Sequence, residues 1–190
     1  MLLLPAVAPR AQSGTTGAAT VYSRPYVLSD ELGGFRLGSA TGSGTKADPL
    51  AVNLELLSAS PVTLTIRALV PFRGVRPSGE DPMEMMYFHV STLNNSGLAW
   101  IEFEFELQEI LGKASVFSDG LSFDQRRTET KTIYSDRFAQ FSRDFEPYDR
   151  LLFRDGRVDP LETVSFSFLV TDFTPRDKIY LVLDPRIPTS

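Results

Sequence analysis

The sequence predicts an all-β protein, a two-sheet antiparallel β-sandwich of the jelly-roll kind with about eight strands and one or two short helices. Three observations predict this class. Apolar and polar side chains alternate along several segments, turn sequences separate those segments, and aromatic residues that suit a pleated surface are abundant, with 14 Phe and 6 Tyr. A chain of 190 residues is long enough for one domain with a sizeable core.

The clearest alternation spans residues 100–107. Apolar side chains occupy every second position, and the positions between them carry Trp100, Glu102, Glu104 and Glu106. Neighbouring side chains of a strand point to opposite faces, so these four should face away from the core. The same pattern predicts further strands at residues 52–56, 64–70, 86–90, 164–170 and 179–183.

The segments between and beside these strands predict turns, a loop and short helices. Residues 38–45 are small and predict a loop. Residues 134–145 carry Phe at helical spacing and predict a short helix, and residues 109–116 predict a helical turn. Residues typical of turns occur at 58–61, 94–97 and 154–157.

The N-terminus predicts export. Residues 1–8 are apolar and end in the Ala-x-Ala pattern of a signal-peptidase site, and residues 11–19 are small and polar. We therefore expect residues 1–20 to be a signal-peptide remnant or flexible leader, and residues 21–190 to form a single sandwich domain. A disordered apolar N-terminus is the alternative. No later segment has the roughly 18 consecutive apolar residues of a transmembrane span.

Composition excludes several function classes. The formal net charge of -5 argues against binding to nucleic acid, which requires clustered Lys and Arg. The absence of Cys from the sequence excludes disulfides, thiolate metal sites and Cys nucleophiles.

Catalytic residues are not recognisable in the sequence. A hydrolase triad needs a base, and His89 is the one histidine of the chain. It lies in an alternating run, between Phe88 and Val90, and should therefore be a structural residue on the face opposite the core. A hydrolase that uses carboxylates alone is the less favoured alternative, because the 24 acidic residues form no recognisable constellation.

The acidic residues offer two candidate sites. Glu102, Glu104 and Glu106 share one strand face, where the simplest interpretation is a solvated surface and the sharper one is a partner surface or cation site. Asp119 and Asp124 flank a turn with Ser122 between them, a composition that could bind calcium or form an ordinary turn.

Three aromatic residues offer a different kind of site. Trp100, Tyr87 and Tyr180 alternate with core residues, so their rings should face away from the core. Exposed rings on a sandwich can stack on sugars, which would make the protein a carbohydrate-binding module.

Several segments resemble a known group of proteins. Residues 94–107 join an Asn-rich turn to a Trp-x-x-Phe-x-x-x-Leu strand, and Asp-Gly-Leu-Ser-Phe-Asp follows at residues 119–124. With residues 153–156 and 164–168, this series resembles exported bacterial β-sandwich proteins of the exosortase-sorted, PEP-CTERM-like group. The Pro-Glu-Pro motif, transmembrane helix and basic tail of that group are not seen in the sequence. The resemblance implies an extracellular or periplasmic structural domain and assigns no catalytic residues.

The expected function follows from these points. We expect a non-enzymatic structural or interaction subunit of a bacterial surface assembly or envelope complex, located outside the cell, on its surface or in the periplasm. Protein subunits are the expected partners and carbohydrate is the alternative. No cofactor is expected, apart from the calcium considered at Asp119 and Asp124.

Overall fold

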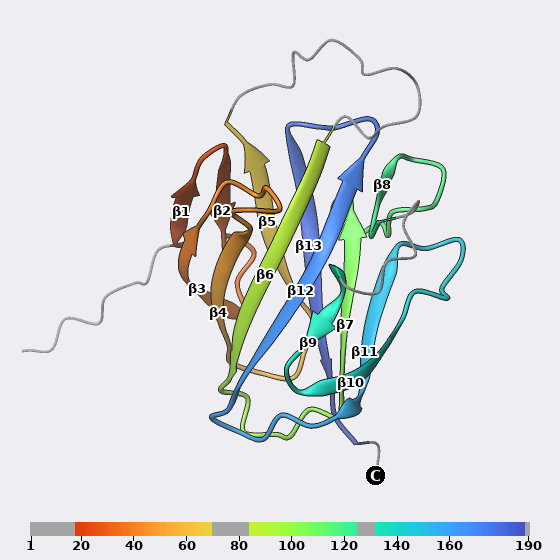
Figure 1. Ribbon diagram of the computed structural model, residues 1–190. Helices are drawn as coiled ribbons and strands as arrows, with labels where there is room; N and C mark the ends of the chain where they lie inside the picture. Colours follow the sequence, from red (N-terminus) through yellow and green to blue (C-terminus); the bar gives the residue numbers. More distant parts are fainter. Residues whose placement is uncertain (1–17, 70–83, 125–131, 189–190) are drawn as a thin grey trace, which may run out of the picture.

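The computed structural model describes residues 18–69, 84–124 and 132–188, and within these ranges the chain forms thirteen strands in two packed sheets (Figure 1). The predicted two-sheet β-sandwich is confirmed, but the prediction of about eight strands is wrong, because the described residues form thirteen. Residues 1–17 of the predicted leader (1–20) and position Val70 lie outside the described residues, and the first strand already begins at Thr20.

One sheet has seven strands, and each strand is antiparallel to its neighbours. Strand β7 lies between β13 and β11, which supply the side chains on either side of it. In spatial order the strands are β1 (Thr20–Ser23), β2 (Tyr26–Ser29), β5 (Val62–Ala68), β13 (Lys178–Arg186), β7 (Glu102–Gln108), β11 (Arg150–Gly156) and β10 (Phe138–Ser142).

The other sheet is mixed, because β4 and β6 run parallel. The prediction of purely antiparallel sheets is therefore wrong at this one pairing. In spatial order the strands are β3 (Phe35–Thr41), β4 (Leu50–Leu56), β6 (Glu84–Asn94), β12 (Thr163–Asp172) and β8 (Leu121–Ser122), and β9 (Tyr134–Ser135) pairs with β12.

Aromatic rings fill the space between the sheets. The ring centroid of Phe105 on β7 lies 5.0 Å from that of Phe166 and 4.9 Å from that of Phe168, both on β12. Phe103 lies next to Phe105 in the same cluster, 4.7 Å from Phe166. Truncating a buried aromatic residue to Ala costs about 3–5 kcal/mol, so these contacts between sheets are a main source of stability.

The predicted helices are not present in the described residues. Residues 134–145 contain β9 and β10, in which Phe138 is buried and Phe141 pairs with Phe153 of β11. A strand pairing has replaced the helical pattern, and it buries Phe138 in the core and packs the partly buried Phe141 against it. Residues 109–116 form a turn in which the Lys113 N–H donates to the Ile110 carbonyl at 2.9 Å.

Two smaller predictions about loops also need correction. Strand β3 runs to Thr41 through the small residues predicted as a loop, with a register shift between Leu37 and Ser39. Strand β11 continues to Gly156, so residues 154–156 are not a hairpin turn. The other alternating segments form β4, β5, β6, β7, β12 and β13 as predicted.

The described residues contain no helix that is long and apolar enough to cross a membrane.

Candidate functional site

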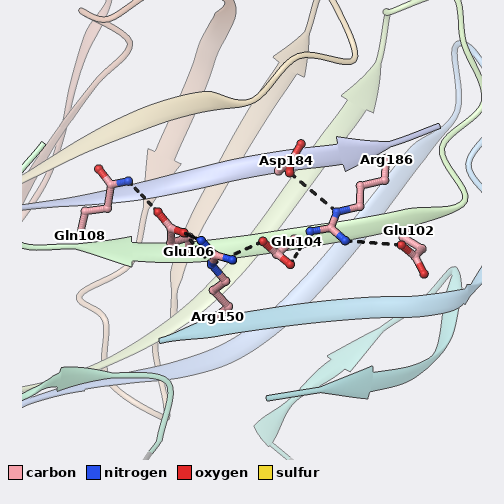
Figure 2. A network of polar contacts seen from close by, with 7 residues as sticks. All are labelled: Glu102, Glu104, Glu106, Gln108, Arg150, Asp184 and Arg186. Carbon is pink, nitrogen blue, oxygen red and sulfur yellow. Dashed lines mark hydrogen bonds and ion pairs between the residues drawn. The ribbon is translucent and has the colours of Figure 1, made fainter. Parts of the chain in front are cut away.

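The outer face of β7 carries a network of charged side chains. Phe103, Phe105 and Leu107 point into the core, so the residues between them point to the opposite face of the seven-stranded sheet. Figure 2 shows these side chains in a row along β7, with arginines reaching them from both neighbouring strands. We call this group the outer-face network: Glu102, Glu104, Glu106, Gln108, Arg150, Asp184 and Arg186.

Glu104 lies at the centre of the outer-face network and is only 5% exposed. Its Oε2 accepts a hydrogen bond from Arg186 Nη2 at 2.6 Å, and its Oε1 lies 3.8 Å from Arg150 Nε. Burial raises the pKa of Glu104, while the charges of Arg186 and Arg150 lower it. The prediction of a simply solvated acidic face is therefore wrong for Glu104.

The other network residues complete the pairing. Arg150 Nε donates to Glu106 Oε2 at 2.7 Å, and Gln108 Nε2 donates to Glu106 Oε1 at the same distance. Arg186 also lies 3.8 Å from Glu102 Oε2 and 3.8 Å from an oxygen of Asp184. The network thus holds four carboxylates with two guanidinium groups, in a register set by the strand pairing.

The aromatic residues proposed to bind sugars are mostly covered. Trp100 is fully buried, and its Nε1 donates to Ser96 Oγ at 3.1 Å. It precedes β7 and pairs with Val158 as an isolated bridge, so strand alternation does not fix its side chain. Tyr180 points away from the core beside Gln108 but is buried by its neighbours, and Tyr87 is half-buried. The predicted exposure is therefore wrong for Trp100 and Tyr180.

His89 is exposed on the face opposite the core, as predicted. Its Nδ1 lies 3.1 Å from Ser167 Oγ on the neighbouring strand β12.

Asp119 is used by its own loop. Its carboxylate accepts hydrogen bonds from Ser115 Oγ at 2.8 Å, the Val116 N–H at 2.9 Å and the Leu121 N–H at 3.2 Å. These bonds close the loop before β8 in the manner of a capping aspartate.

Asp124, the second residue of the calcium prediction, is buried and has a positive φ of 46°. Its Oδ2 accepts a hydrogen bond from Thr132 Oγ1 at 3.4 Å. Over residues 18–69, 84–124 and 132–188, no three His, Asp or Glu side chains gather in a way that could hold a metal ion. Calcium at Asp119 and Asp124 stays a prediction.

A pocket that the sequence did not indicate lies at the end of the sandwich where β7 ends. It has a volume of about 190 Å³ and is formed by the loop that follows β7 and the loop that precedes β11. We call it the loop pocket; its lining residues are Phe117, Ser122, Phe123, Arg143, Asp144, Glu146, Pro147, Tyr148, Asp149 and Arg150.

Asp149 is the one buried charged residue among those that line the loop pocket, at 8% exposed. Its backbone is fixed, because its N–H donates to the Ser115 carbonyl at 3.0 Å and its carbonyl accepts from the Leu107 N–H at 3.1 Å. Its Oδ2 is buried and has no hydrogen-bond partner among the described residues. Burial raises the pKa of Asp149 to about 6; hydrogen bonding to Ser122 lowers it and the charge of Asp119 raises it.

Large apolar side chains are exposed on the same two loops, and two of them, Phe117 and Tyr148, line the loop pocket. Ile110, Leu111, Phe117 and Tyr148 are between 46% and 58% exposed. The loops are joined where the Phe117 N–H donates to the Pro147 carbonyl at 2.9 Å. We call these four side chains the loop-end surface. Sequence reasoning missed both features, because no local pattern shows that residues 109–120 and 143–149 are neighbours.

No known protein family, curated protein or solved structure is detectably similar to this chain. The function of this chain must therefore be inferred from its fold and from the surface described above.

Proposed function

We propose that this chain is a non-enzymatic interaction module, a β-sandwich that serves as a structural or interaction subunit of a bacterial surface assembly or envelope complex. The loop-end surface is the observation that carries this proposal. Four large apolar side chains exposed on two loops that are joined by hydrogen bonds are typical of a surface that is covered by a partner.

Hydrogen bonds hold the two loops in one conformation, which supports the proposal. Backbone hydrogen bonds close the turn at Ile110 and join residues 115–117 to residues 147–149. A surface that is already ordered loses less conformational entropy when a partner binds it. The predicted export of the chain and its resemblance to exosortase-sorted proteins support the envelope location.

Cross-linking in cells of the native organism, followed by mass spectrometry, tests this proposal. Ile110→Ser combined with Leu111→Ser should abolish the cross-linked partner while leaving the melting temperature close to that of wild type, because both side chains are solvent-exposed. Leu98→Ser is the matched control. It removes an equally exposed apolar side chain from the loop that precedes β7, at the opposite end of that strand.

Loss of the partner in the double variant alone supports the proposal. Equal recovery of the partner with all three proteins would place the interface elsewhere and contradict it. A hydrolytic activity that survives purification and disappears with Asp149→Asn would show that the chain is an enzyme.

A further inference from the structure

We propose that the loop pocket binds the ammonium group of a lysine side chain from a partner protein, with Asp149 as its counter-ion. This inference rests on the interaction role proposed above, because it names the chemistry of the partner that would approach the loop-end surface.

The first argument is that, within the part of the chain that the structure describes, Asp149 has no cation of the kind that Glu104, Glu109 and Asp184 have. Burial raises the pKa of Glu104, Glu109 and Asp184, and each of them is opposed by at least one arginine. Glu109, for example, lies 2.7 Å from Arg176 Nε. Asp149 is also buried, yet among the described residues no arginine or lysine lowers its pKa, and the one charge that acts on it there is the like charge of Asp119.

The second argument is the unsatisfied oxygen. A buried polar atom without a partner costs about 1–3 kcal/mol, and more when the group is charged. Oδ2 of Asp149 is such an atom among the described residues, and Asp149 lines the pocket. A positively charged ligand in the pocket would offset the charge of this carboxylate, whose Oδ2 is shielded from solvent in the free protein.

The third argument is the charge of the pocket lining. Asp144, Glu146 and Asp149 contribute three carboxylates against the guanidinium groups of Arg143 and Arg150. Arg150 is bound to Glu106, with its Nη2 2.6 Å from Glu106 Oε2. The pocket therefore favours a cation over an anion.

Backbone carbonyls bind one end of the Arg143 guanidinium group. Its Nη1 donates to the carbonyls of Phe123 at 2.7 Å and Asp124 at 2.8 Å, so this end of the group is directed at the backbone.

The shape of the site favours lysine. Phe117, Pro147 and Tyr148 are among the residues that line the pocket, and their apolar surfaces suit the four-carbon stem of a lysine side chain. An ammonium group is a compact point charge that can donate to a single oxygen, whereas a guanidinium is best matched by two. The guanidinium carbon of Arg150 lies 5.2 Å from the Tyr148 ring centroid, a cation–π contact that holds this side of the opening in place.

Titration calorimetry on the whole protein tests the inference at pH 7.5. The probe is the peptide acetyl-Gly-Gly-Lys-Gly-Gly-amide, and the matched control peptide has norleucine in place of lysine. We expect binding of the lysine peptide, at least tenfold weaker binding of the norleucine peptide, and at least tenfold weaker binding of the lysine peptide to Asp149→Asn. Asp144→Asn, an exposed carboxylate of the same pocket, should weaken binding less than threefold.

Other outcomes overturn the inference. Equal affinity for the two peptides, or unchanged affinity after Asp149→Asn, would show that the carboxylate does not recognise the ammonium group. Binding of calcium chloride or of methyl glycosides in place of the lysine peptide would assign the pocket to another ligand.

The inference and the proposed function can fail separately. The Ile110→Ser and Leu111→Ser double variant should still bind the lysine peptide, because neither side chain lines the loop pocket. Lysine binding without a cross-linked partner contradicts the interaction role, and a partner that depends on Ile110 and Leu111 without lysine binding contradicts the pocket assignment.

Discussion

Glu104 and Asp149 are buried carboxylates in two very different regions of the molecule. Glu104 lies on the regular outer face of β7, and Asp149 lies in the loop pocket before β11. Burial raises the pKa of both groups. The sheet provides Glu104 with two arginines, whereas the loops provide Asp149 with the Ser122 hydroxyl and the charge of Asp119.

The difference shows where the chain has balanced its buried charges and where it has not. In the sheet, strand register places Arg150 opposite Glu106 and Arg186 opposite Glu102, so each guanidinium lies next to Glu104 as well. The outer-face network is therefore complete without a ligand. Asp149 is held by backbone hydrogen bonds in a place that leaves Oδ2 without a partner among the described residues, as expected of a site that is completed by binding.

The largest effect that follows from this comparison is expected for Arg186→Ala. The substitution removes the shortest contact of Glu104, at 2.6 Å, and leaves a buried carboxylate with the more distant Arg150. We expect the free energy of unfolding to fall by about 2–3 kcal/mol, because breaking a buried pair from one side exposes the desolvation penalty. Urea denaturation at pH 7 measures it.

Arg157→Ala is the control for this variant. Arg157 pairs with Asp159 at 2.7 Å, but both side chains are more than half exposed, so its loss should change the unfolding free energy little. Equal effects of the two substitutions would show that the outer-face network is no stronger than an ordinary surface pair.

Much of this fold could be predicted from sequence because strand alternation is a local signal. The strands at residues 102–108 and 163–172 show the period of two in their own side chains. The helix predicted at residues 134–145 was wrong because Phe spaced three or four apart also fits a strand pair joined by a turn. Trp100 was misplaced because it lies just outside the strand whose alternation was applied to it.

The candidate sites could not be predicted in the same way. Glu104 accepts a hydrogen bond from Arg186, which is 82 positions away in the chain. Glu106 accepts one from Arg150, which is 44 positions away. The sequence contains these residues but not the strand order that makes them neighbours. Asp149 likewise depends on the bridge between Val116 and Tyr148, which no local pattern indicates.

Asp149→Asn is expected to produce the next largest effect, with the opposite sign. Because the pKa of Asp149 is raised from 3.8 to about 6, the folded protein holds a proton between these pH values that the unfolded chain has released. The stability of the wild type should therefore fall as pH rises from about 4 to about 6 and then level off. The amide removes this titration, so the variant should be more stable at pH 8 by about 2–3 kcal/mol and similar to wild type near pH 4.

Thermal melts of both proteins from pH 4 to pH 8 measure this difference. Asp144→Asn is the control, since this exposed carboxylate lies in the same pocket. An Asp149→Asn variant that is less stable than wild type at pH 8 would mean that the carboxylate already has a counter-ion in the free protein, which would remove the contrast with Glu104.

The smallest effect is expected for Glu104→Gln. This variant tests whether the ion pairs of Glu104 stabilise the fold or only offset the cost of burying its charge. The amide oxygen can still accept a hydrogen bond from Arg186, and the cost of burying a charge disappears together with the attraction to the two arginines. These changes oppose each other, so the unfolding free energy should change by about 1 kcal/mol or less, measured by urea denaturation beside Arg186→Ala. A loss as large as that of Arg186→Ala would show that ion pairing at Glu104 is a net source of stability. A small change, with a large one for Arg186→Ala, would show that what the fold requires at Glu104 is the absence of an unpaired charge. Asp149 then differs from Glu104 in that no arginine or lysine of the described residues acts on it, and this is the feature that a partner would explain.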